Sequence, residues 1–239
     1  MFFKRYGKIT NMPQIKAWEK EYQNPQLLTK KEEPQNDLKR FFKFLRKTEK
    51  IIPAGLVVLD LGSGTGRNIN YLAQLGSKVT GLEISQTALD LAKERAFAIG
   101  VEVDYRLFDI GSVYPFENEQ FDLVLDVMSS NSLNEKEREI YLREVFRVLK
   151  SGGFFFVKAL CKDGDKNAKN LLKISPGKEK DTYLNRDMGL TERVFTQDDF
   201  IKIYAQYFKV IQLTKKTNYA QFKGQSYKRN YLISYFKKP

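Results

Sequence analysis

The stretch that decides the fold is VVLDLGSGTGRN, residues 57–68. It begins with a short apolar run typical of a buried strand, passes through a glycine-rich turn and ends where a helix is expected to begin at Arg67. Glycine lets the backbone come within contact distance of a ligand, and the first turn of a helix offers free N–H groups. The stretch therefore predicts a ligand-binding loop between a strand and a helix.

Strands and helices alternate on both sides of this loop. Further strands are expected at residues 78–83, 101–108, 121–127, 154–160, 210–213 and 231–236. Helices are expected at residues 67–75, 86–99, 135–150 and 197–208, the last three with Ser85, Asn134 and Thr196 as N-caps. Repeated strand–helix–strand units predict an α/β, doubly wound fold, in which a mostly parallel sheet carries helices on both faces.

Two regions stand outside this pattern. Residues 1–50 are expected to form a helical N-terminal extension, in which Leu38, Phe41, Phe42 and Leu45 make one apolar stripe that would pack on the sheet. Residues 51–239 form the α/β domain. Within it, the polar segment at about 161–195 predicts an insertion after the fifth strand, at the end of the sheet where long loops are often functional.

Composition excludes several classes of site. The chain is 42% apolar and 29% charged and has no apolar run near the ~20 residues of a membrane-spanning helix. The start, MFFKRYGK, lacks the apolar stretch of a signal peptide, so a cytoplasmic protein without a membrane partner is expected. Histidine is absent and Cys161 is the single cysteine, which excludes histidine-dependent triads, His/Cys zinc sites and an intrachain disulfide. No metal is expected.

The net charge of +12 is unevenly placed. Lys and Arg outnumber Asp and Glu by 13 to 6 in residues 1–50 and by 18 to 8 in residues 158–239, whereas residues 51–157 carry 10 against 15. Two basic flanks are compatible with an anionic partner such as nucleic acid. Solvated lysine-rich surface is the favoured interpretation, because Lys outnumbers Arg in both flanks and neither has a dense basic cluster.

An acid follows the loop at an informative distance. Glu83 ends the next strand, 21 positions after Gly62, the spacing at which a carboxylate accepts hydrogen bonds from a ribose diol. The alternative is a surface charge at a strand end. The glycine spacing is G-x-G-x-G rather than G-x-G-x-x-G, so a dinucleotide with a pyrophosphate is less expected.

Residues 57–68 resemble motif I of the class I S-adenosylmethionine (SAM)-dependent methyltransferases. The resemblance continues through GLEIS at 81–85, FDLVLD at 121–126 and EVFRVLKSGG at 144–153, so four motifs in order cover roughly residues 55–160. The resemblance implies a Rossmann-like, seven-stranded, mostly parallel sheet whose last strand is antiparallel. It also implies that the cofactor is SAM, without a metal.

The resemblance assigns roles to individual positions. The cofactor-binding residues that it implies are Asp60, Gly62, Ser63, Gly64, Gly66, Glu83, Ile84, Asp109, Ile110 and Asp126. The glycine loop would wrap the methionine part and ribose, with Asp60 ordering the loop near the cofactor's ammonium and Glu83 holding the ribose hydroxyls. Asp109 would accept from the adenine amino group, with Ile84 and Ile110 against the ring; the alternative for Asp109 is a loop-capping acid.

Asp126, at the end of the fourth strand, would face the transfer site and is the candidate catalytic residue. The alternative is a buried acid satisfied by backbone N–H groups. The Gly-Arg-Asn sequence after the loop and the short helical N-terminus also resemble the tellurite-resistance and thiopurine type of small-molecule methyltransferase, in which the N-terminal segment closes over SAM. Trp18 and Tyr22 are then candidates for a lid, although core aromatics of a docked helix are slightly favoured.

The expected function is transfer of a methyl group from SAM to a small-molecule acceptor, by a monomer or homodimer. The Asp/Asn-Pro-Pro-aromatic signature of amino-methyltransferases is absent after the fourth strand, and Cys161 is a lone cysteine. The alternatives are methylation of RNA or another macromolecule, and a non-catalytic SAM-binding subunit. The segments expected near the acceptor contain Tyr183, Arg193, Tyr219, Tyr227 and Arg229, each of which is interpreted first as packing or surface.

Overall fold

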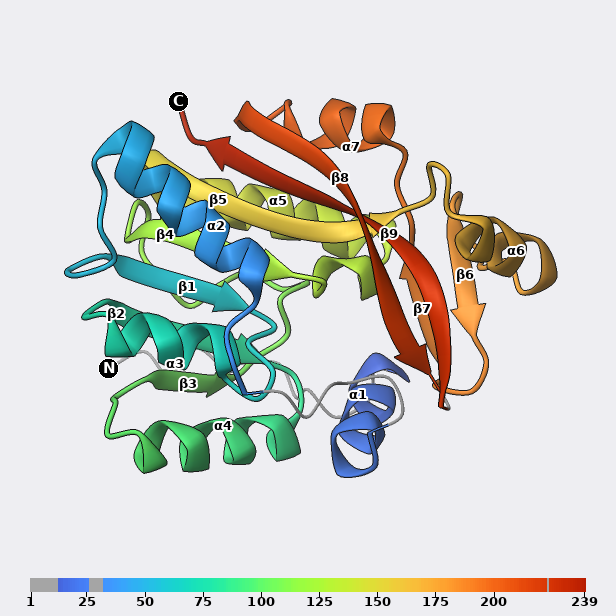
Figure 1. Ribbon diagram of the computed structural model, residues 1–239, viewed down its shortest axis with the longest axis horizontal. Helices are drawn as coiled ribbons and strands as arrows, with labels where there is room; N and C mark the ends of the chain where they lie inside the picture. Colours follow the sequence, from blue (N-terminus) through green and yellow to red (C-terminus); the bar gives the residue numbers. More distant parts are fainter. Residues whose placement is uncertain (1–12, 26–31, 223) are drawn as a thin grey trace.

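A computed structural model describes residues 13–25, 32–222 and 224–239 of the chain. Parts of the predicted N-terminal extension, residues 1–12 and 26–31, lie outside the described residues. The main body is a seven-stranded sheet of order β3-β2-β1-β4-β5-β9-β8 (Figure 1). Its strands are β1 Val57–Leu61, β2 Lys78–Glu83, β3 Asp104–Leu107, β4 Phe121–Val127, β5 Leu149–Cys161, β8 Lys209–Phe222 and β9 Gln225–Lys237.

Strands β1 to β5 pair in parallel, and β9 runs antiparallel to both of its neighbours, β5 and β8. The predicted mostly parallel, doubly wound sheet with an antiparallel last strand is confirmed. The sheet order reverses between β1 and β4, so the carboxyl ends of these strands diverge into a crevice where α/β proteins bind ligands.

Helices cover both faces of the sheet. They are α2 Asn36–Phe44, α3 Arg67–Gln74, α4 Gln86–Ala98, α5 Glu135–Val148 and α7 Gln197–Tyr204. Apolar side chains of α2 and α3 pack in one core cluster with Leu123 and Phe156, whereas those of α5 and α7 pack in another with Phe155 and Phe236. The predicted stripe on α2 is therefore buried against the sheet, and a π-helical turn, Leu45–Glu49, follows that helix.

The predicted N-caps are confirmed at all three helices. Ser85 accepts from the Ala88 N–H at the start of α4, and Thr196 accepts from the Asp199 N–H at the start of α7. Asn134 and Glu137 form a reciprocal capping box at the start of α5. Each cap satisfies amide donors that the first helical turn leaves unpaired.

Several predicted boundaries were wrong, among them the start of the strand expected at 101–108, which begins at Asp104. The helix expected to extend to residue 150 ends at Val148, and β5 begins at Leu149 and continues through Gly152, where φ is +73°. The helix expected over residues 197–208 ends at Tyr204. The strands expected at 210–213 and 231–236 are 14 and 13 residues long, because β8 and β9 continue pairing through polar residues beyond the core.

The segment after β5 contains regular structure that its sequence pattern did not indicate. It forms helix α6, Lys166–Ile174, and a hairpin of β6, Thr182–Asn185, and β7, Leu190–Arg193. Buried Ala168 and Tyr183 pack this unit with Leu160, beside the long β8–β9 hairpin (Figure 1).

Helix α1, Pro13–Gln23, contacts α4 and β7 (Figure 1). It thereby crosses the crevice at the carboxyl ends of the central strands. Among the described helices, none is long and apolar enough to span a bilayer.

Candidate functional site

The turn between β1 and α3 requires glycine at three positions. Gly62, Gly64 and Gly66 have φ values of +68°, +55° and +80°, a left-handed region that other residues rarely adopt. A Cβ atom on Gly62 would lie 2.3 Å from Ser129 Oγ, and one on Gly66 would lie 2.2 Å from Tyr105 Oη. At Gly62 and Gly66 the loop therefore packs so closely against Ser129 and Tyr105 that there is no room for a side chain.

Glu83 ties this loop to the end of β2. Its Oε2 accepts from the Gly64 N–H at 2.8 Å, and its Oε1 accepts from the N–H groups of Ile84 and Ser85 at 2.8 and 3.0 Å. Its side chain is almost fully buried, and this burial raises the pKa of Glu83 although the three backbone bonds oppose the rise. The acid thus orders the loop from the neighbouring strand.

Three buried acids gather at the carboxyl ends of β1, β2 and β4. Asp60 lies beside Glu83 and Asp126, and none of the three is more than 4% exposed. Burial, followed by the charges of Asp126 and Glu83, raises the pKa of Asp60 to about 8, while Arg67 opposes the rise. Mutual repulsion of buried carboxylates is relieved by a positive charge, so this end of the sheet favours a cationic ligand.

Asp126 uses both carboxylate oxygens within the protein. Oδ1 accepts from the N–H groups of Ser129 and Ser130 at 2.9 and 3.3 Å, and Oδ2 accepts from Tyr141 Oη at 2.6 Å. Its side chain is fully buried and does not line the cavity at the glycine loop. This is the arrangement of the buried acid that the sequence left as the alternative. An effect of Asp126 on catalysis would act through the position of the segment after β4.

A cavity of about 130 Å³ adjoins the glycine loop. Of the residues that the resemblance implied, it brings together Gly62, Glu83, Ile84, Asp109 and Ile110. Residues not predicted also line it, from the segment after β4 and from α1: Val127, Met128, Ser129, Ser132, Leu133 and Gln14, together with Phe108. Among the residues that do not line it are Asp60, Ser63, Gly64 and Gly66, which support the loop from behind.

Asp109 combines both interpretations that the sequence left open. Its Oδ1 accepts from the Gly111 N–H at 2.8 Å, as a loop-capping acid does. The same side chain lines the cavity, and among the described residues its Oδ2 has only a long contact of 3.5 Å with Ser112 Oγ. One oxygen therefore orders the loop while the other stays free to accept from a ligand.

Helix α1 closes the cavity from the open side. Trp18 and Tyr22 line it, and Tyr22 Oη lies 2.8 Å from where a Cβ on Gly64 would be. Glu19 fixes the helix by accepting from Ser85 Oγ at 2.6 Å and from the hydroxyl and N–H of Thr87. Burial opposes ionisation of Glu19, but these bonds prevail and lower its pKa.

The cavity is smaller than the ~300–1,000 Å³ of ordinary small-molecule sites. Its residues nevertheless fit a cofactor with a ribose, an adenine and positive charge: a carboxylate at the end of β2, a second at Asp109, apolar Ile84 and Ile110, and the acid cluster. Such a cofactor is larger than this cavity, of which α1 forms one wall.

A second cavity, of about 330 Å³, lies beside the inserted unit and is lined by Tyr183, Tyr227 and Arg229. Arg229 and Glu192 have partners there: Arg229 contacts Asp165 at 3.3 Å and Tyr183 at 3.2 Å, and Tyr183 donates to Glu192 at 2.8 Å. Tyr219 is instead 71% exposed on the β8–β9 hairpin. The sequence did not indicate a role for Glu192, because its partner Tyr183 lies opposite it on the other strand of the β6–β7 hairpin.

The part of the chain that the structure describes contains no group of three or more His, Cys, Asp or Glu side chains arranged to hold a metal ion.

Comparison with known proteins decides the family. A family described as "Methyltransferase domain" matches residues 59–157. An uncharacterised methyltransferase of Schizosaccharomyces pombe is 30% identical over 102 residues, which are 43% of this chain and 70% of that protein. The chain belongs to the class I SAM-dependent methyltransferase family.

Other members of the family are longer or more distant. A ubiquinone biosynthesis O-methyltransferase of Methylobacterium sp. (strain 4-46) is 36% identical over 107 residues, 45% of this methyltransferase and 42% of that protein, so the match spans about two fifths of its length. The structure of Burkholderia thailandensis 1,6-didemethyltoxoflavin-N1-methyltransferase has a TM-score of 0.70 at 17% identity, covering 95% of this chain and 87% of that one. That likeness concerns the fold.

Proposed function

We propose that this methyltransferase transfers the methyl group of SAM to a small-molecule acceptor. The observation that carries the proposal is the cavity in which the glycine loop, Glu83 and Asp109 meet under α1. The relatives support it, since one is named for ubiquinone biosynthesis and a structural neighbour for 1,6-didemethyltoxoflavin.

The residues lining the cavity have separate tasks in this proposal. Glu83 accepts hydrogen bonds from the ribose hydroxyls, the free oxygen of Asp109 accepts from the adenine amino group, and Ile84 and Ile110 flank the ring. Asp60, behind the loop, favours the cationic part of the ligand through its charge. When bound, SAM supplies a methyl group already activated by its sulfonium.

The remaining task of the chain is to orient the acceptor and exclude water. Helix α1 serves the second purpose, because Trp18 and Tyr22 cover the open side of the cavity. The segment after β4, with Met128, Ser129 and Ser132, forms the wall that an acceptor would approach. Met128 has a φ of +73°, unusual for a side chain with a Cβ, and the Asp126 bonds to the next two residues stabilise this turn.

Two measurements test the proposal. Calorimetry is expected to show binding of SAM and S-adenosylhomocysteine in the micromolar range, and the Glu83→Ala variant is expected to lose most of it. Incubation with methyl-labelled SAM and cell extract is expected to label the small-molecule fraction. Label in the RNA or protein fraction would favour a macromolecular acceptor, and binding without any transfer would favour a non-catalytic subunit.

A further inference from the structure

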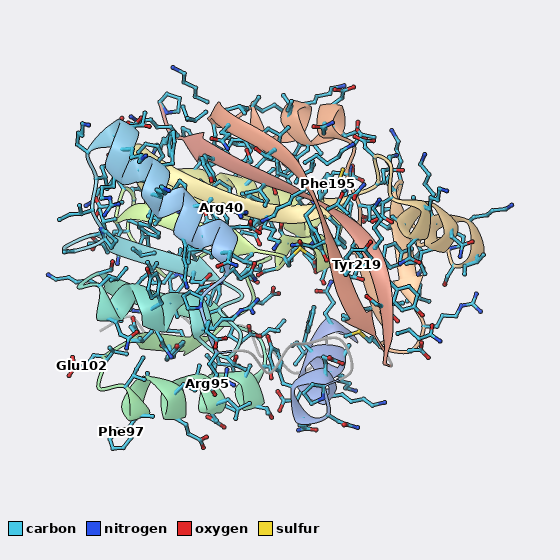
Figure 2. All side chains as sticks on the ribbon, viewed as in Figure 1. Arg40, Arg95, Phe97, Glu102, Phe195 and Tyr219 are labelled. Carbon is cyan, nitrogen blue, oxygen red and sulfur yellow. The ribbon has the colours of Figure 1, made fainter. Side chains whose placement is uncertain are left out.

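Two arginines from different elements share one aromatic ring. Arg138 lies in the first turns of α5, and Arg193 ends β7. Their guanidinium carbons lie 5.7 and 5.0 Å from the centroid of the Phe195 ring. Phe195 is fully buried and bridges to Cys161 at the end of β5, beside β9 (Figure 2).

Most of the buried donors of this pair have no acceptor. Arg138 is 3% exposed, and only its Nη2 makes a hydrogen bond, to the Leu133 carbonyl, while Nε and Nη1 have no partner among the described residues. Arg193 Nε is likewise buried without a partner there. The ring of Phe195 attracts the positive charge but accepts none of the in-plane N–H bonds.

Each nearby carboxylate is engaged elsewhere through one oxygen, and Asp181 Oδ2 is buried without a partner among the described residues. Glu179 Oε1 accepts from the Glu135 N–H at 3.0 Å, and Asp181 Oδ1 pairs with Lys162 Nζ at 2.6 Å. Within the described residues, neither Arg138 nor Arg193 forms an ion pair, in contrast to Arg229, which pairs with Asp165 at 3.3 Å. The arginine pair therefore differs in kind from the paired charges around the second cavity.

A buried charge, Arg138, beside a half-buried like charge, Arg193, is costly for the folded state when no counter-ion accompanies them. Burial lowers the pKa of Arg138, and the charge of Arg193 lowers it further. Binding of an anion between the two arginines would therefore stabilise the folded state, because a carboxylate or phosphate accepts several hydrogen bonds from guanidinium groups.

Arg138 is also connected to the cofactor cavity. The Leu133 carbonyl that holds Arg138 belongs to a residue lining that cavity, as does Ser132, whose buried Oγ has no partner in the described chain. We propose that Arg138 and Arg193 bind an anionic group, a carboxylate or a phosphate, carried by the methyl acceptor, with Ser132 on the path between this group and the cofactor. This inference rests on the proposed function and narrows its substrates to anionic small molecules.

The binding test uses simple probes. Benzoate, phenyl phosphate and the neutral analogue benzamide are titrated by calorimetry into the full chain saturated with S-adenosylhomocysteine. We expect saturable binding of one anion and none of benzamide, and the better anion tells carboxylate from phosphate. Equal binding of benzamide, or binding of no probe by a protein that binds the cofactor product, would overturn the inference and leave the proposed function standing. Failure to bind the cofactor product would instead remove the proposed function.

Variants locate the site. Arg138→Gln and Arg193→Gln are expected to weaken binding of the anion roughly tenfold or more, because each removes charged hydrogen bonds. The control is Arg143→Gln, on the exposed side of the same helix as Arg138, which is expected to change nothing. Cofactor affinity is expected to stay the same in all three. Equal weakening by the control would overturn the inference.

Stability separates a binding role from a structural one. If Arg193 is kept for a ligand, Arg193→Met leaves the melting temperature of the ligand-free protein unchanged or higher, because it removes a half-buried positive charge that lies beside Arg138 without a counter-ion among the described residues. A lower melting temperature would make the arginine a structural residue. RNA binding that is strong in the wild type and lost in Arg193→Gln would assign the anion to a nucleic acid backbone and overturn the small-molecule form of the proposal.

Discussion

The backbone N–H of Gly64 donates to Oε2 of Glu83 at 2.8 Å, and this bond joins the glycine loop after β1 to the end of β2. The acid proposed to hold the ribose therefore also shapes the loop that lies beside it. Because the same carboxylate accepts from Ile84 and Ser85, its removal leaves three buried N–H groups without their acceptor. Binding and stability are expected to change together at this position.

Replacement of Glu83 by Ala and by Gln tests this dual role. We expect Glu83→Ala to weaken SAM binding by ~1.5–3 kcal/mol, the range for hydrogen bonds to a charged partner, and to lower the free energy of unfolding by a similar amount. Glu83→Gln keeps one carbonyl acceptor and is expected to lose less of both. Calorimetry and urea unfolding measure the two quantities, and unchanged SAM affinity in Glu83→Ala would exclude Glu83 from the site.

The raised pKa of Asp60 predicts a pH-dependent stability. The unfolded chain releases this proton near 3.8, whereas burial and the charges of Asp126 and Glu83 hold it in the folded protein until about 8. The contribution of Asp60 to the free energy of unfolding is thus fully present below the pKa of the unfolded chain. It is lost as the pH rises through the pKa of the folded protein. We expect the melting temperature of the wild type to fall over this range more than that of Asp60→Asn.

The same group predicts proton release on binding. The positive charges of SAM favour the ionised carboxylate, so its binding near neutral pH lowers the pKa of Asp60 and expels part of its proton. The heat of SAM binding is then expected to differ between buffers of low and high ionisation enthalpy, and Asp60→Asn is expected to abolish the difference. Identical heats in both buffers for the wild type would contradict this assignment.

Movement of α1 has a built-in reporter, since Trp18 is the single tryptophan of the sequence and lines the cavity. We expect SAM to change its fluorescence. Glu19→Ala removes the acceptor that fixes α1 on Ser85 and Thr87, so it is expected to shift the emission to longer wavelength and to speed both association and dissociation of SAM in stopped flow. Lys20→Ala, exposed on the same helix, is the control. Unchanged emission and rates in Glu19→Ala would argue against a lid.

Asp126 and Tyr141 form a buried pair whose role can be measured. Asp126→Asn is expected to destabilise the protein by ~1–3 kcal/mol, because Asn has one acceptor oxygen and cannot accept both from the Ser129 and Ser130 N–H groups and from the Tyr141 hydroxyl. A double-mutant cycle with Tyr141→Phe is expected to show coupling, as two residues in contact do. A variant of full stability that binds SAM but has lost methyl transfer would instead support the catalytic role.

The sequence predicted those parts of the molecule that depend on local pattern. The glycine loop, Glu83 and the caps Ser85, Asn134 and Thr196 each have a signature within a few residues, and the structure contains all of them. Parallel strands buried on both faces are continuous apolar runs, so β1 and β4 were found with nearly correct bounds.

The missed features depend on contacts between distant segments. The outer part of β8 contains Lys215 and Lys216, and its conformation is fixed by backbone pairing with β9 rather than by an apolar face. Likewise, Arg138 and Arg193 meet only because Phe195 lies between them, 57 and two positions away along the chain. A local sequence pattern cannot predict contacts between residues so far apart in the chain.

The last prediction concerns RNA, the alternative that the basic flanks left open. Residues 158–239 contain 18 Lys and Arg, and at least six of these form ion pairs within the fold: Lys158, Lys162, Lys216, Arg229, Lys237 and Lys238. A charge that is paired with a carboxylate contributes little to the field that attracts a polyanion. We therefore expect weak RNA binding with a shallow salt dependence in a filter-binding titration. Six phosphate contacts would instead cost on the order of 10³ in affinity between ~50 and ~200 mM salt, because each contact releases a counter-ion. A tight complex with that steep dependence, and a methylated nucleoside in the digested RNA, would replace the small molecule with RNA as the acceptor.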